Sequence, residues 1–277
     1  MQASATQDSR SDRPLIDGHT HIDQFASEDI GPLLNRAREA NVGLIIAAGV
    51  TLDSCRRVQM LADAHPIVYA GVGLHPADLT GWMDDRTAAE LRRLANHPRV
   101  VEWSETGLDY MPHSPAHDVQ QDAFRRQIRL AREFGLPLVT HSREADDDTV
   151  RLLHEEGAGE VGGAWHYFQG DLALAERIID LGFYISLAKP LLRLPELQAA
   201  VEQLPLDRIV IETDSYPQPF KKNPIRRTEP WHLPQVAEKL AELQRTDVET
   251  VAEVTTANYL RMLRGRVDAE VLLPARD

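Results

Sequence analysis

The feature that most constrains the fold is an alternation of eight short apolar runs with longer segments of helical periodicity. Residues 43–48 are apolar at every position, which is typical of a strand that is buried on both faces of a parallel sheet. Between such runs, apolar residues recur with the period of a helix, most clearly over residues 118–134 and also over 171–181 and 233–243. The expected strands are residues 14–19, 42–50, 67–74, 100–105, 136–141, 162–166, 182–187 and 209–214.

Eight strands that alternate with helices over about 250 residues are typical of a TIM-type (β/α)8 barrel. The sequence therefore predicts an α/β protein with a single barrel domain over residues 13–277, preceded by a flexible tail at 1–12. Residues 267–277 are expected to form an appendage on the barrel. A doubly wound open sheet has similar local patterns, so it remains the alternative fold.

Composition and charge exclude several classes of protein. With 43% hydrophobic residues, the chain is too apolar to be disordered. The single cysteine, Cys55, excludes an internal disulfide and fits a reducing compartment. Because no apolar run approaches the ~20 residues that cross a bilayer and no signal core is present, we expect a cytoplasmic protein without a membrane partner. The net charge of −13 means that a polyanion would have to bind through a local basic patch or a metal ion.

Ionisable side chains gather at the ends of the expected strands, where barrel enzymes place their active sites. His19 and His21 are two residues apart in the first strand, so their side chains point the same way and can reach one ion together. Glu105 ends the fourth strand, and its two oxygens could bridge two cations. The alternative for each residue alone is a polar side chain with an ordinary hydrogen-bond partner.

The eighth strand carries the motif that is hardest to explain by packing. Glu212 and Asp214 lie on one face of an apolar run, and two buried acids need a cation or a protonated partner. His141 and His166 end the fifth and sixth strands. Together the strand ends offer four histidines and two carboxylates, which suffice for a two-metal hydrolytic centre if one carboxylate is shared. These six predicted ligands are His19, His21, Glu105, His141, His166 and Asp214.

The same motifs resemble those of the TatD family of metal-dependent deoxyribonucleases, within the amidohydrolase-type barrels. The resemblance extends from about residue 15 to residue 263. It is carried by Asp-Gly-His-Thr-His at 17–21, Gly-Leu-His-Pro at 73–76, Ser-Glu-Thr-Gly-Leu-Asp-Tyr at 104–110, the Gln-x-x-x-Phe helix at 120–124, Pro-Leu-Val-Thr-His-Ser-Arg-Glu-Ala at 137–145, His-Tyr-Phe-Gln-Gly at 166–170 and Glu-Thr-Asp at 212–214.

The resemblance implies a DNase that hydrolyses phosphodiester bonds from a 3′ end with two divalent ions, which are Mg, Mn or Zn. It assigns one ion to His19, His21 and Asp214, the other to His141 and His166, and the bridging position to Glu105. DNA is then the substrate, and no obligatory protein partner is evident.

Further roles follow from the proposed chemistry. We expect Asp214 to accept the proton of the attacking water and Asp17 and Glu212 to orient ligands. Phosphate oxygens need donors, and the candidates for substrate binding are His75, Arg143, Lys221 and Lys222.

Two departures from the family pattern stand out. Ser104 and Thr106 replace the usual Gly and Ile on either side of Glu105, which leaves the ligand intact. After the eighth strand, the usual Pro-Tyr order is reversed at 216–217, and Thr228 stands where Asn is usual. That loop is expected to shape substrate binding.

Two other functions remain open on the sequence. One is a dinuclear-metal hydrolase of small esters, lactones or amides on the same barrel. Many such enzymes bridge their metals with a carbamylated lysine on the fourth strand, but no lysine precedes Lys189, so that subtype is excluded. The other is a barrel that binds a partner without catalysis. Its mark would be loss of ligands, and all six are present.

Overall fold

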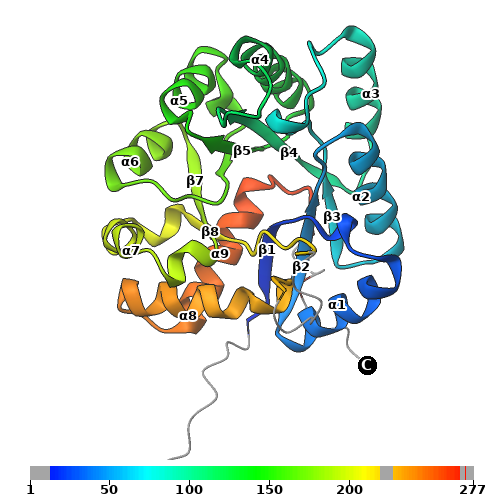
Figure 1. Cartoon of the computed structure of the whole chain (residues 1–277). Helices are drawn as coiled ribbons and strands as arrows, with labels where there is room; N and C mark the ends of the chain where they lie inside the picture. The colour runs from blue at the N-terminus through cyan, green and yellow to red at the C-terminus, as the bar shows by residue number, and fades with distance from the viewer. Residues whose placement is uncertain (1–12, 219–226, 269–271, 273–277) are drawn as a thin grey trace, which may run out of the picture.

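Eight parallel strands follow one another around a barrel in the order of the sequence (Figure 1). The computed structural model describes residues 13–218, 227–268 and 272. The strands are β1 Leu15–Thr20, β2 Val42–Ala48, β3 Val68–Gly71, β4 Val100–Asp109, β5 Leu138–Arg143, β6 Gly163–Trp165, β7 Phe183–Leu187 and β8 Ile209–Ile211. This sequential order confirms the (β/α)8 barrel. It rules out a doubly wound sheet, whose strand order reverses at a switch point.

The barrel closes between β1 and the segment that follows β8. The Asp214 amide donates to the His19 carbonyl at 3.0 Å, and the His21 amide donates to the Ser215 carbonyl at 2.7 Å. β8 ends at Ile211, three residues before the predicted end, whereas β4 continues to Asp109, four residues beyond its predicted end. The hydrogen bonds of the closing seam fix the backbone on both sides of two predicted ligands.

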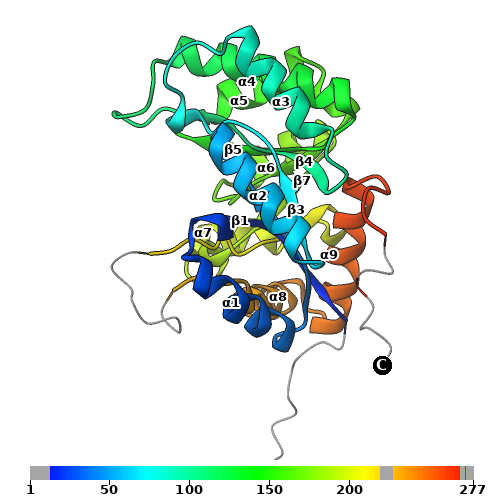
Figure 2. The same ribbon diagram turned by 90° about the vertical axis from the view of Figure 1, so that its right-hand side faces the viewer.

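Helices surround the strands on the outside of the barrel, except for α9, which lies across one end (Figures 1 and 2). They are α1 Ser27–Glu39, α2 Leu52–Ala64, α3 Asp85–Ala95, α4 His117–Phe134, α5 Asp146–Glu155, α6 Leu172–Asp180, α7 Pro195–Val201, α8 Leu233–Gln244 and α9 Val248–Met262. Asp171 caps α6 by accepting from the Leu174 amide, which satisfies one of the free donors at the helix start. Helix α9 covers the amino-terminal end of the barrel, where Asn258 donates to the Ile209 carbonyl at 2.6 Å.

Apolar side chains of the strands pack in two layers, one on each face of the sheet. In β2, Ile45 and Ala47 pack outward against the helices, while Leu44 and Ile46 fill the barrel interior. This double burial explains the continuous apolar runs of the sequence. Tyr259 and Met262 of α9 join the interior layer from the amino-terminal end. The predicted ligands lie at the opposite, carboxyl end of the barrel.

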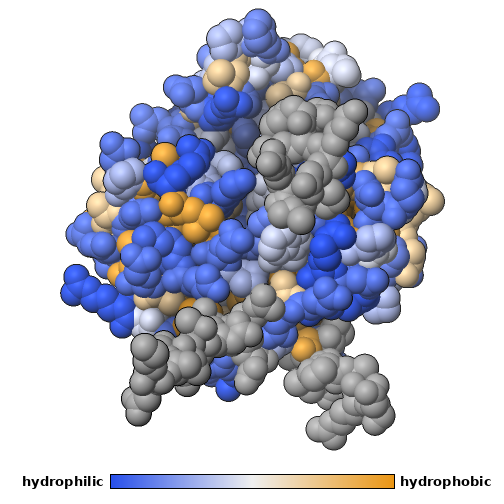
Figure 3. Space-filling view, turned by 60° about the horizontal axis from the view of Figure 1, so that its bottom comes forward, coloured by the Kyte–Doolittle hydropathy of each residue, from blue (hydrophilic) through white to orange (hydrophobic). Residues whose placement is uncertain are grey.

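On the face in Figure 3, the surface is mainly hydrophilic, and its hydrophobic patches are small and separate. Among the described helices, none combines the length and apolar content needed to cross a membrane. The predicted tail at 1–12 lies outside the described residues. Of the predicted appendage, 267, 268 and 272 are described, and Leu272 is buried against the interior layer.

Candidate metal centre

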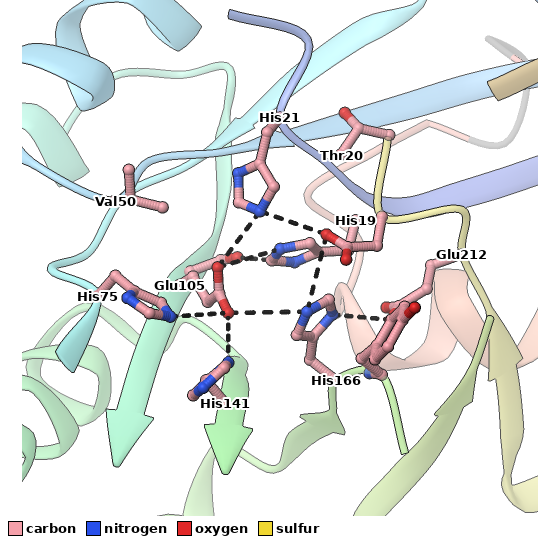
Figure 4. A network of polar contacts seen from close by, with 12 residues as sticks. His19, Thr20, His21, Val50, His75, Glu105, His141, His166 and Glu212 are labelled. Atoms are coloured by element: carbon pink, nitrogen blue, oxygen red, sulfur yellow. Dashed lines mark hydrogen bonds and ion pairs between the residues drawn. The ribbon is translucent and has the colours of Figure 1, made fainter. Parts of the chain in front are cut away.

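The six predicted ligands meet at the carboxyl end of the barrel around the buried carboxylate of Glu105, and Figure 4 shows the four predicted histidines around it. Its Oε2 lies 3.5 Å from His19 Nε2 and 3.4 Å from His21 Nε2. Asp214 Oδ1 lies 3.4 Å from His21 Nε2 and 4.0 Å from His166 Nε2. His21 Nε2 thus lies between two carboxylates, Glu105 from β4 and Asp214 from the segment after β8.

The second oxygen of Glu105 faces the other side of the cluster. Its Oε1 lies 2.9 Å from His141 Nδ1 and 3.7 Å from His166 Nε2. His75 also approaches it, with Nε2 at 3.6 Å, and the rings of His75 and His141 are 4.5 Å apart. The sequence predicted His75 only as a substrate contact, whereas the structure places it among the candidate ligands.

This cluster fits a divalent metal. His19 Nε2 is buried and has no hydrogen-bond partner within the described chain, although it points at the carboxylates. Among the described residues, three groups each bring one ligand atom per residue within 4.8 Å of one another: His19, His166 and Asp214; His19, His21 and Glu105; His75, Glu105 and His141. Imidazole and carboxylate together suit Zn and Mn. His166 is thus grouped with His19 and Asp214, and His141 with His75, which differs from the pairing that the resemblance implied.

Burial and charge oppose each other across the cluster. Burial disfavours a charge on Glu105, but His75 and His166 outweigh it and hold the pKa of the carboxyl well below its usual value. Burial likewise disfavours charge on His166, but Glu212 and Glu105 raise its pKa to about 10. The pKa of Asp214 is lowered, because the surrounding histidines outweigh its burial. Without a metal, the cluster therefore holds protonated imidazole beside ionised carboxylates.

We expect metal binding to release protons and to tighten as the pH rises. His166 with a pKa of about 10 is protonated at neutral pH, and a ligand histidine must be neutral, so the metal has to displace a proton. Calorimetric titration with Mn²⁺ at pH 6 and pH 8, in buffers of different ionisation enthalpy, measures the affinity and the number of protons released. Equal affinity at both pH values with no proton release would contradict this expectation.

Two further acids support the cluster from behind. The Asp17 carboxylate accepts from the Thr213 amide at 2.8 Å and from the Thr213 hydroxyl at 2.6 Å. These contacts brace the segment that carries the predicted ligand Asp214. Glu212 Oε1 lies 2.7 Å from His166 Nδ1, as expected of an orienting residue, and also accepts from the Tyr167 amide at 2.7 Å.

A pocket of about 590 Å³ opens above the cluster. Of the predicted substrate contacts, His75 and Arg143 line it, while Lys221 and Lys222 lie outside the described residues. The sequence missed five further lining residues, because they lie outside any metal-ligand pattern: Gln24, Ser142, Tyr167, Gln169 and Tyr216. For Tyr216, the reversed Pro-Tyr order was a usable signal.

Comparison with known proteins gives consistent matches over nearly the whole chain. The family described as TatD related DNase matches residues 16–264. An uncharacterized metal-dependent hydrolase of Bacillus subtilis, YabD, is 34% identical and covers 90% of this chain and 99% of its own. The 3′-5′ ssDNA/RNA exonuclease TatD of Edwardsiella piscicida is 31% identical and covers 86% and 94%. The crystal structure of the Escherichia coli TatD homologue YJJV aligns with a TM-score of 0.81 at 29% identity and covers 90% and 97%.

Proposed function

This chain belongs to the TatD family of metal-dependent hydrolases, and we propose that it is a DNase that hydrolyses phosphodiester bonds from a 3′ end. The observation that carries the proposal is the convergence of histidines and carboxylates on Glu105 at the floor of an open polar pocket. The relative from Edwardsiella piscicida that is named as a 3′-5′ exonuclease supports the choice of substrate. We further propose two divalent ions, which are Mg, Mn or Zn.

In the proposed hydrolysis, different residues bind the metal, accept a proton and bind the phosphate. Divalent ions held by Glu105, Asp214 and the histidines would supply a water of lowered pKa and would polarise the phosphate. Glu105 and the histidines would keep the charge of the ions in a buried position, where it acts more strongly than in water. Asp214 lines the pocket and stays ionised, so it can accept the proton of the attacking water. Arg143, at the end of β5, can donate to phosphate oxygens from the rim.

The test compares substrates directly. End-labelled single- and double-stranded DNA, simple esters and lactones are incubated with the protein and Mn²⁺, with a chelator as control. We expect shortening of DNA from the 3′ end that the chelator abolishes. If the protein hydrolyses esters or lactones and leaves DNA intact, it is instead a metal-dependent hydrolase of small esters, lactones or amides.

We expect DNA binding to weaken with salt, and Arg143→Ala to flatten that response. Each phosphate contact on a single strand contributes about −0.7 to the slope of log affinity against log salt, so losing Arg143 should reduce the slope by about that amount. Arg38→Ala is the matched control, because Arg38 is exposed near the end of α1, which returns to the opposite end of the barrel. The measurement is the Michaelis constant for single-stranded DNA over a salt series. A flat response of the unaltered protein would count against a polynucleotide substrate.

A further inference from the structure

A fully buried acid, Glu102, lies in the barrel interior below the metal cluster and belongs to none of the candidate ligand groups. It precedes Glu105 by three residues in β4. Two glycines leave space for Glu102 and for the side chains that contact it. A Cβ on Gly71 would lie 2.6 Å from Ser104 Cβ and 3.2 Å from Glu102 Cγ. A Cβ on Gly18 would lie 2.1 Å from the ring of Tyr259.

Tyr259 reaches Glu102 from the amino-terminal end of the barrel. Its side chain extends from α9 into the interior, where the hydroxyl contacts the Gly18 carbonyl at 2.7 Å and Glu102 Oε2 at 3.2 Å. A phenol has only one proton. If the Tyr259 hydroxyl donates this proton to the Gly18 carbonyl, which is the nearer partner, it has none left for Glu102. The hydrogen bond between Tyr259 and Glu102 then needs a proton on the Glu102 carboxyl. Burial raises the pKa of Glu102 to about 8, which agrees with a protonated acid at neutral pH.

Ser104 connects Glu102 to the metal cluster. Its hydroxyl lies 3.4 Å from His19 Nδ1. On the other side, a Cβ on Gly71 would lie 2.6 Å from Ser104 Cβ and 3.2 Å from Glu102 Oε1, so the two residues are neighbours. Glu102 Oε1 is buried without a hydrogen-bond partner within the described chain, and it is therefore the acceptor that remains for the Ser104 hydroxyl. The other ring nitrogen, His19 Nε2, faces Glu105 Oε2 at 3.5 Å. If Nε2 is the atom that binds metal, the single proton of the neutral ring is on Nδ1 and can be donated to Ser104.

We infer that Tyr259, Glu102 and Ser104 form a hydrogen-bonded chain that positions His19, with Nε2 directed at the metal centre. Each donor then has one acceptor: His19 Nδ1–H donates to Ser104, Ser104 to Glu102, Glu102 to Tyr259, and Tyr259 to the Gly18 carbonyl. The TatD family usually has Gly at the position of Ser104, so this chain adds a hydroxyl beside a ligand histidine. The inference rests on the proposed role of His19 as a ligand and does not depend on the substrate.

The test is Mn²⁺ binding to the whole protein, with Glu102→Gln compared with Glu102→Leu, and Ser104→Ala tested beside them. An amide can still accept from Ser104 and donate to Tyr259, so Glu102→Gln should keep the affinity of the unaltered protein. Glu102→Leu and Ser104→Ala interrupt the chain and should weaken binding by about 10–100-fold, which is typical when the support of a ligand is lost. Nitrogen NMR of the ring should also show loss of the Nδ1–H tautomer of His19.

Thr255→Val is the matched control, because it removes a buried hydroxyl that bonds within α9 and should leave the affinity for Mn²⁺ unchanged. If Glu102→Leu does not fold, Ser104→Ala carries the test alone. Unchanged affinity and tautomer in Ser104→Ala, or equal weakening in Glu102→Gln and Glu102→Leu, would overturn the inference. A protein that binds Mn²⁺ as described but leaves DNA intact would instead refute the proposed nuclease function.

Discussion

Glu105→Gln is expected to abolish hydrolysis, with a fall in kcat/KM of at least about 10³-fold. The change keeps the size of the side chain but removes the charge that faces five histidines at 2.9–3.7 Å. A metal centre contributes several kcal/mol to the stabilisation of the transition state, and each 1.36 kcal/mol corresponds to a tenfold change in rate. The measurements are steady-state kinetics on single-stranded DNA and the metal content of the purified variant.

Glu202→Gln is the control for this variant, because Glu202 is exposed at the end of α7 and should leave both quantities unchanged. Loss of activity together with loss of metal supports Glu105 as a shared ligand. If Glu105→Gln keeps both its metal and its rate, a centre organised around Glu105 is ruled out.

The barrel could be predicted from the sequence because its signal is local. A strand that is buried on both faces appears in the sequence as a continuous apolar run, as at residues 43–48. Closure of the barrel could not be read in this way. It depends on hydrogen bonds between β1 and Asp214 and Ser215, nearly two hundred residues apart, and local periodicity contains no information about such pairing.

The predicted ligands lie at one place because the carboxyl ends of parallel strands meet at one end of a barrel. Position along a strand was therefore enough to find them, but not to assign them to groups. His75 follows β3 in a loop, and only the folded chain reveals its approach to Glu105. Glu102 was hidden within an apolar run, although its two-residue spacing from Ser104 places both side chains on one face of β4.

Asp214→Asn is expected to lower kcat by about 10²–10⁴-fold, the range that a positioned general base contributes. The amide can still offer an oxygen to a metal but cannot accept a proton at neutral pH. The lowered pKa of Asp214 means that the unaltered residue is already ionised there, so the loss should be similar from pH 6 to pH 8. The measurement is single-turnover cleavage of DNA with saturating Mn²⁺.

Asp214→Ala separates the loss of the base from general damage to the site. Asp214 lines the open pocket, and its side chain is 20% exposed, so the space left by alanine can admit a small carboxylate. Added formate should restore part of the rate of Asp214→Ala but none of the rate of Asp214→Asn, whose amide fills that space. Two results would assign the proton of the attacking water to another acceptor. In one, formate restores the rate of both variants. In the other, formate restores the rate of neither variant although their affinity for Mn²⁺ is unchanged. The role of Asp214 would then be confined to holding the metal and His21.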